Sequence, residues 1–159
     1  MMELEVNEEN LEKFLNNIRR QDKEELLYHF KKNYRKKFKQ TVKKSKNTYF
    51  VGDKNCNPIA IGGFQECKRR NTFLVWLLCT NELVKNKKEL FKYIKTKLEI
   101  YKKNCLILFN YIYKSNFQSF NFLKNLGFEI LDTKNKDFKL FYYTNVKKGN
   151  YFDIRYITC

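Results

Sequence analysis

Two short apolar runs limit most strongly what this chain can fold into. They cover residues 73–79 (Phe-Leu-Val-Trp-Leu-Leu-Cys) and 105–113 (Cys-Leu-Ile-Leu-Phe-Asn-Tyr-Ile-Tyr), and a stretch with the apolar spacing of a helix separates them. Strands that are apolar at successive positions are covered on both faces. The two runs therefore predict two central strands of a sheet.

The rest of the chain alternates between helical and strand patterns. Apolar spacing predicts helices over about residues 7–17, 22–42, 86–103 and 115–126. Short runs bounded by turn residues predict further strands at 48–51, 58–64, 128–131 and 138–146. Asn86 and Glu89 have the spacing of a capping box, which places the start of the third helix at Asn86. Gly62 and Gly63 indicate a bulge or a close backbone approach, and Gly127 indicates a helix stop. The order predicts an α/β (α+β) domain around a mixed sheet.

Length and composition favour one folded domain. A chain of 159 residues can bury a core but is too short for two domains, and no linker interrupts it. We predict a single domain over 1–159, with a core at about 3–146 and a C-terminal extension at 147–159. Fifteen Phe and eleven Tyr argue against disorder.

No segment predicts a membrane span or a secretion signal. No apolar run approaches the roughly 20 residues that cross a bilayer, and the acidic opening is unlike a signal peptide. We expect a protein that is intracellular or packaged inside a particle. The cysteines are scattered and only one histidine is present, so a zinc site is not predicted. Cys79 and Cys105 lie in the apolar runs and are expected to be buried reduced thiols.

The net charge of +16 is the strongest global signal. Nine basic residues and no acidic residue lie between Lys31 and Lys46. Such a stretch is either a solvated helix face or a surface for nonspecific contact with nucleic acid. Arginine is scarce in the sequence, although proteins that recognise phosphates and bases specifically prefer it.

Residues 116–128 resemble the late helix-to-strand motif of Gcn5-related N-acetyltransferases (GNAT). Asn116, Gly127 and Phe128 fall at the spacing of that family. Together with the element order, the resemblance covers about residues 3–146. It implies a GNAT-like sheet of about six to seven strands flanked by about four helices, in which two central strands, here 73–79 and 105–113, splay apart.

Several segments are also similar to the acetyltransferase-like proteins of short-tailed bacteriophages, a group that includes an internal virion protein. These segments are Pro58-Ile-Ala-Ile-Gly-Gly, the strand with Trp76, the lysine-rich helix after it, Asn110-Tyr-Ile-Tyr and Phe122-Leu-Lys-Asn-Leu-Gly. This narrower resemblance implies a location in the host cytoplasm or in the phage virion.

The resemblance implies acetyl-CoA as the cofactor. In the family its diphosphate lies at the N-terminus of the helix after the first splayed strand, where N–H donors and the helix dipole attract anions. A glycine-rich loop normally allows that approach, but residues 80–90 contain no glycine. Either Lys85, Lys87 and Lys88 bind the diphosphate through side-chain charge, or the lysines are only a solvated helix start.

The cofactor-binding residues that the resemblance implies come from the end of the first splayed strand, the helix start and the later motif. They are Leu78, Cys79, Thr80, Lys85, Asn86, Lys87, Lys88, Asn116 and Ser119. For Asn116, a structural place in the first turn of a capped helix is the alternative.

The catalytic groups of the family are altered in this sequence. The position of its proton-donating tyrosine is Leu123, which cannot donate a proton. Tyr111 or Tyr113 could replace that tyrosine, or they could simply pack in the sheet. Glu66 and Glu82 are the available carboxylates for the base, or they are ordinary surface groups.

Two functions remain open at this point. The first is an acyl-CoA-dependent N-acetyltransferase that acts on an amine of a protein or a small molecule. The second is a catalytically inactive GNAT scaffold that serves as a virion or assembly component, or associates with nucleic acid through residues 31–46, with virion proteins as its partners. Fold alone does not decide between them.

Overall fold

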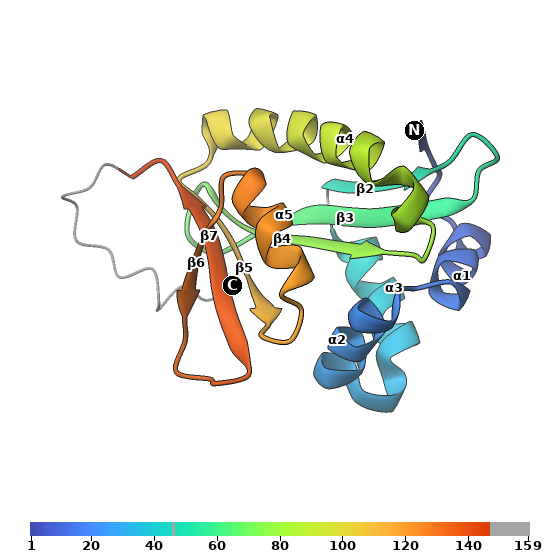
Figure 1. The fold of residues 1–159 in the computed structure, drawn as a ribbon, viewed down its shortest axis with the longest axis horizontal. Coiled ribbons are helices and arrows are strands. Elements are labelled where there is room, and N and C mark those ends of the chain that lie inside the picture. Colours follow the sequence, from blue (N-terminus) through green and yellow to red (C-terminus); the bar gives the residue numbers. More distant parts are fainter. Residues whose placement is uncertain (46, 147–159) are drawn as a thin grey trace. The chain divides into compact units, whose positions relative to one another are not determined.

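A mixed sheet of seven strands runs through the computed structural model, which describes residues 1–45 and 47–146 (Figure 1). Its strand order is β1-β2-β3-β4-β5-β7-β6. β4 and β5 pair in parallel, whereas β1 with β2, β2 with β3, β5 with β7 and β6 with β7 are antiparallel. The strands are β1 (Met2–Glu3), β2 (Asn47–Gly52), β3 (Pro58–Glu66), β4 (Thr72–Cys79), β5 (Ile107–Tyr113), β6 (Glu129–Asp132) and β7 (Phe138–Thr144). The predicted fold class is confirmed, with the two apolar runs as β4 and β5.

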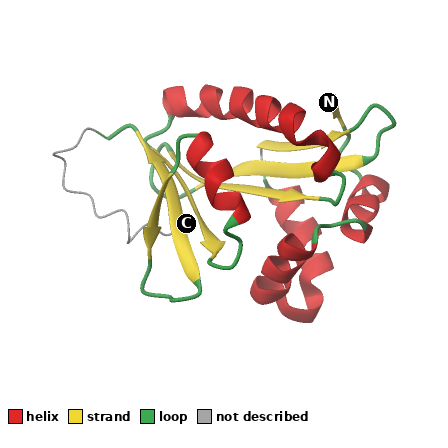
Figure 2. Ribbon diagram, viewed as in Figure 1, coloured by secondary structure: helices red, strands yellow, loops and turns green. Residues whose placement is uncertain are grey.

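Five α-helices and one 3₁₀ turn accompany the sheet in the described residues (Figure 2). They are α1 (Glu8–Asn16), α2 (Arg20–Phe30), η1 (Lys31–Asn33), α3 (Tyr34–Lys44), α4 (Leu83–Asn104) and α5 (Gln118–Asn125). The single helix expected over 22–42 is wrong, because the chain breaks at Lys31. That residue has φ +55° and ψ −146°, a conformation in which a helix cannot continue.

The start of α4 also differs from the prediction. The helix begins at Leu83 and not at Asn86. The side-chain oxygen of Thr80 accepts a hydrogen bond from the Glu82 N–H at 3.3 Å, within the turn that leads into the helix. Asn86 instead donates from its side chain to the Glu82 carbonyl at 2.9 Å.

The described chain divides into two compact units, and each draws on separate stretches of sequence. The first unit comprises Met1–Phe64 and Trp76–Ile94, and the second comprises Gln65–Val75 and the described residues from Lys95 onward. The division falls inside β4, between Val75 and Trp76. A single domain over 1–159 stays a prediction, and the extension expected at 147–159 lies outside the described residues.

The sheet of the first unit is covered on both faces. On one face, α1, α2 and α3 bury a core in which Phe14 lies 5.9 Å from both Phe38 and Phe50, measured between ring centroids. On the other face, Leu90 of α4 packs with Ile59 of β3 and with Cys79. Alternate residues of β4 therefore enter different cores, as strand geometry requires.

Gly62 and Gly63 lie where backbones approach closely. An added Cβ would lie 2.7 Å from the Trp76 carbonyl oxygen at Gly62 and 2.7 Å from the Asn47 carbonyl oxygen at Gly63. The predicted close approach is confirmed, because neither position has room for a side chain.

The second unit is built around β5 and β7. Ile107 and Phe109 of β5 pack with Leu140 of β7 in a fully buried cluster. α5 stops before Gly127, which has φ +86° and donates its N–H to the Lys124 carbonyl at 2.9 Å. The predicted helix stop is therefore confirmed. Cys105 of this unit and Cys79 of the first are buried free thiols, as predicted.

Candidate functional site

β4 pairs with β5 over a short length only. The register covers residues 72–74 of β4 and 107–109 of β5. At the next position the Val75 carbonyl accepts a hydrogen bond from the Asn110 side chain at 2.9 Å, and Asn110 Oδ1 accepts from the Tyr111 N–H at 2.7 Å. The Asn110 side-chain amide therefore takes the place that a backbone N–H of β5 would occupy if β4 and β5 stayed paired. This agrees with the prediction of two central strands that part.

The backbone donors at the start of α4 are already engaged within the first unit. Thr80 donates its N–H to the Ile59 carbonyl at 2.8 Å, and Asn81 donates its N–H to the Asn17 carbonyl at 3.1 Å. After the Glu82 bond to Thr80, the next three N–H groups donate to the carbonyls three residues earlier at 3.2 to 3.4 Å. A diphosphate held by free backbone N–H groups, as in a glycine-rich loop, does not fit residues 80–85.

The lysine side chains at the same place do suit an anion. Lys85, Lys87 and Lys88 are exposed, and Lys85 makes only a loose ion pair with Glu82, 3.4 Å between Nζ and Oε2. No acidic residue stands in the first turn of α4. Cations at a helix N-terminus are opposed by the helix dipole, so an anionic ligand would relieve an unfavourable arrangement. Exposed lysines fit both sequence alternatives, diphosphate binding by side-chain charge and a solvated helix start, and the binding role stays a prediction.

A segment that sequence reasoning missed lies along the edge of β4. The Cys79 N–H donates to Asp22 Oδ2 at 2.6 Å, and the Cys79 carbonyl accepts from the Arg19 N–H at 2.9 Å. Ile18 and Thr80 form an antiparallel bridge beside these bonds. Because the Thr80 N–H points toward β3, the Cys79 N–H points to the opposite edge of β4. Residues 17–22 therefore occupy that edge, and Cys79 has no backbone group left to offer a ligand there.

Asp22 holds this edge contact together. Its side chain is 2% exposed and receives two hydrogen bonds from the Arg19 guanidinium, at 2.6 and 3.1 Å. Burial raises the pKa of Asp22, and the Arg19 guanidinium and the Cys79 N–H oppose that rise. In the sequence, Arg19 and Asp22 only had the spacing of a local ion pair, and nothing linked them to Cys79.

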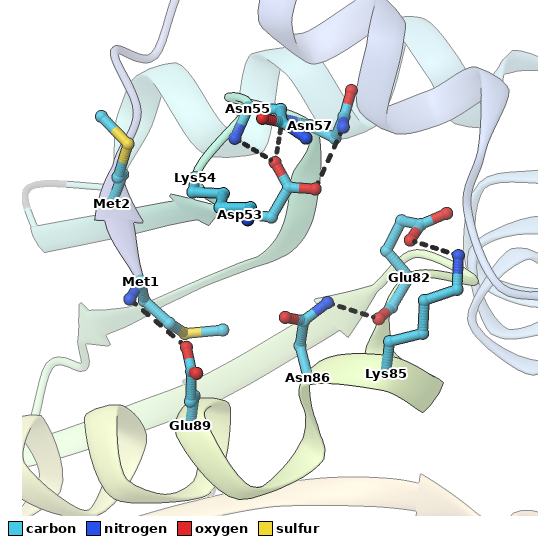
Figure 3. A pocket seen from close by; sticks show the side chains of 10 residues that line it. All are labelled: Met1, Met2, Asp53, Lys54, Asn55, Asn57, Glu82, Lys85, Asn86 and Glu89. Carbon is cyan, nitrogen blue, oxygen red and sulfur yellow. Dashed lines mark hydrogen bonds and ion pairs between the residues drawn. The ribbon is translucent and has the colours of Figure 1, made fainter.

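A cavity of about 620 Å³ opens in the first unit beside the start of α4 (Figure 3). It is lined by the first two residues, the β2–β3 turn and the first two turns of α4, with Glu82, Lys85 and Glu89 among the lining side chains. The Asp53 carboxylate accepts hydrogen bonds from the Asn57 side chain and from the N–H groups of Asn57 and Asn55, which lower its pKa. Glu82, a candidate base, thus borders a polar cavity.

The other catalytic candidates belong to the second unit. The Tyr111 ring lies 6.5 Å from Phe109 and belongs to the cluster of Leu140, whereas the Tyr113 ring lies 5.3 Å from Phe138. Glu66 is exposed at the end of β3. Both tyrosines therefore take part in aromatic packing, and their catalytic roles stay predictions.

Asn116 and Ser119 come together at the start of α5. Asn116 is 5% exposed, and its Oδ1 accepts a hydrogen bond from Ser119 Oγ at 2.9 Å. The Ser119 N–H donates to the Asn116 carbonyl at 3.0 Å. Asn116 therefore lies just before α5, which begins at Gln118 with Phe117 as its N-cap, and not in the first turn as the structural alternative expected. Its cofactor role stays a prediction. Leu78 is buried in the core beneath α1 and α2.

The described ranges contain neither a metal-binding cluster nor a membrane-spanning helix. Within residues 1–45 and 47–146, no three side chains of His, Cys, Asp or Glu gather in a way that could hold a metal ion. In the same part of the chain, no helix combines the length and apolar character that crossing a bilayer requires.

Known proteins resemble this chain in structure and not in sequence. No family model and no curated protein matches the sequence. The PaiA N-acetyltransferase of Thermoplasma acidophilum, solved with coenzyme A, is 18% identical with a TM-score of 0.62 over 90% of this chain and 96% of its own. The N-acetyltransferase PseH of Campylobacter jejuni, solved with acetyl coenzyme A, is 17% identical with a TM-score of 0.55 over 91% and 99%. A GNAT-family acetyltransferase of Bacillus anthracis is 10% identical with a TM-score of 0.60 over 89% and 91%. The chain therefore has the fold of the GNAT N-acetyltransferases.

Proposed function

We propose that this protein is an acyl-CoA-dependent N-acetyltransferase whose lysine side chains replace the glycine-rich loop. The observation that carries the proposal is the start of α4. Three exposed lysines lie in the first two turns of α4, the helix that follows β4, and one of them, Lys85, makes the loose ion pair with Glu82. In this fold, two similar structures were solved with coenzyme A or acetyl coenzyme A.

In the proposed reaction, separate residues bind the cofactor, accept a proton and donate a proton. An acyl-CoA supplies an activated thioester that an amine can attack. Lys85, Lys87 and Lys88 hold the diphosphate by charge, because the backbone donors of residues 80–85 are engaged. Glu82 or Glu66 accepts the proton of the amine, and Tyr111 or Tyr113 protonates the leaving thiolate in place of Leu123.

Calorimetric titration with acetyl-CoA tests the binding step. We expect Lys87→Glu with Lys88→Glu to weaken binding about tenfold, since reversing two exposed charges near a diphosphate costs about 1.4 kcal/mol. The matched control is Lys95→Glu with Lys103→Glu, which changes the same charge at exposed positions further along α4. S-acetyl-pantetheine, which lacks the diphosphate, should bind the Lys87/Lys88 variant and the Lys95/Lys103 control with equal affinity. No heat from the wild-type protein at millimolar acetyl-CoA would refute the proposal.

A second candidate is a scaffold that binds without catalysis. Leucine at position 123 and the occupied backbone edge at Cys79 favour it. In that case the protein would serve as a virion or assembly component of a bacteriophage. Release of free coenzyme A thiol, followed with a panel of amines, separates the two: binding without any thiol release, unchanged by Tyr111→Phe and Tyr113→Phe, supports the scaffold.

A further inference from the structure

The exposed face of α3 carries almost nothing but positive charge. Four lysines, Lys36, Lys37, Lys43 and Lys44, are exposed, and Gln40 is the remaining exposed residue of the helix. At about 100° per residue these positions span roughly 120° of the helix surface. The opposite face, with Phe38 and Val42, is buried in the core of the first unit.

The other two cations of α3 are used internally. Arg35 donates to Glu12 of α1, and Lys39 donates to both Glu12 and Glu8. These contacts lower the pKa of Glu12, chiefly through Lys39. The two carboxylates of α1 nearest to α3 are therefore already paired with Arg35 and Lys39, and they leave the four exposed lysines unneutralised.

Two more exposed lysines precede α3 in the chain. Lys31 and Lys32 of η1 are exposed, and the Lys31 ammonium lies 5.3 Å from the centre of the Tyr28 ring. No carboxylate occurs in the sequence from Lys31 to Ser45. Lys36 and Lys37 also stand in the first turn of α3, where the helix dipole disfavours cations. Lys43 and Lys44 stand in the last turn, where the dipole favours cations. The dipole therefore opposes only Lys36 and Lys37, and an anionic partner would relieve that pair.

We propose that the α3 face formed by Lys36, Lys37, Lys43 and Lys44, together with the adjacent exposed Lys31 and Lys32, binds the phosphate backbone of nucleic acid without reading its sequence. The lysine ammonium is a point charge that suits contact with single phosphates, and it lacks the planar guanidinium with which arginine binds two acceptor atoms at once. The pairs 36/37 and 43/44 are seven residues apart, about 10.5 Å along the helix, so the same helix face presents two separate pairs of positive charges to the phosphates.

An anionic membrane is the weaker partner for this face. Amphipathic helices bind membranes by burying an apolar face among the lipids. The apolar residues of α3 are committed to the protein core, and Phe38 and Val42 are each 2% exposed. α3 can therefore attract an anionic membrane by charge, but it has no free apolar face to insert into the lipids.

Fluorescence anisotropy of a labelled 20-base-pair duplex at several salt concentrations tests the proposal. We expect the wild-type protein to bind with log K falling linearly against log salt, with a slope near −4 to −5 for four to six phosphate contacts. Changing Lys36, Lys37, Lys43 and Lys44 to Gln should reduce the slope by about 3 to 4 and weaken binding about 100-fold or more at 0.1 M salt. A scrambled duplex should bind equally well.

The matched control removes four exposed lysines elsewhere: Lys95, Lys103, Lys124 and Lys136, each changed to Gln. It lowers the net charge by the same amount, so it should retain most of the slope and affinity. Equal losses in the two variants would mean that only total charge matters, and would overturn the proposal. So would the absence of duplex binding at 0.05 M salt, or binding to phosphatidylserine vesicles that duplex DNA does not displace.

Discussion

The contact between Asp22 and Cys79 offers the sharpest test of the structure. Asp22→Ala removes the acceptor of the Cys79 N–H and the partner of the Arg19 guanidinium in one step. Both groups then lose a hydrogen bond at a position where Cys79 is 3% exposed. We expect a marked loss of stability, because a buried donor without an acceptor carries its full desolvation cost.

The magnitude follows from the burial of the two partners. An unsatisfied buried N–H costs about 1–3 kcal/mol. Breaking a buried ion pair costs about 3–5 kcal/mol, but the Arg19 side chain is 20% exposed and can turn toward water, so the lower part of that range applies. We therefore expect Asp22→Ala to lower the free energy of unfolding by about 3 kcal/mol, or the Tm by about 6–12 °C.

Urea unfolding followed by circular dichroism at pH 7 measures this change. Asp22→Asn keeps an oxygen for the Cys79 N–H and should lose about half as much. Glu24→Ala on the same helix breaks the exposed pair with Arg20 and should cost less than about 0.5 kcal/mol. If the free energies of unfolding of Asp22→Ala and of the Glu24→Ala control differ by less than about 0.5 kcal/mol, residues 17–22 do not hold the edge of β4 as described.

Two further predictions concern the same unit. Glu12→Gln should lower the midpoint of urea unfolding at pH 7, since Lys39 and Arg35 stabilise the ionised carboxylate and hold its pKa low. That stability is present above the ordinary pKa of Glu and is lost as pH falls through the lowered value, so wild type and variant should converge in acid; a constant difference down to pH 2 would contradict it. Gly62→Ala places a Cβ 2.7 Å from the Trp76 carbonyl oxygen and should cost about 1–3 kcal/mol in the same measurement, whereas an unchanged midpoint would show that the strands can move apart.

Much of the fold could be predicted because its signals are local. The apolar runs became β4 and β5, and Gly127 became a helix stop with positive φ. The close approach of neighbouring backbone at Gly62 and Gly63 could also be predicted, because only a residue without a side chain permits it. The break at Lys31 was not, because apolar spacing continues through residues 22–42 and a lysine with positive φ leaves no mark in the sequence.

The candidate site could be predicted only in part. The lysines at the start of α4 and the missing glycines were visible as residue types. The engagement of the backbone donors was not, because it depends on partners such as Ile59 and Asn17 that are far away in the chain.

The sequence by itself therefore determined most of the order of strands and helices, the two central strands and the strong positive charge, since side-chain periodicity and composition are properties of short stretches. Only the tertiary structure decided which backbone groups are still available to a ligand. Asp22 and Cys79 are separated by 57 positions, and their 2.6 Å hydrogen bond exists only when α2 and β4 are brought together. The same holds for α3, where packing against α1 determines that Arg35 and Lys39 are neutralised while four lysines face the solvent.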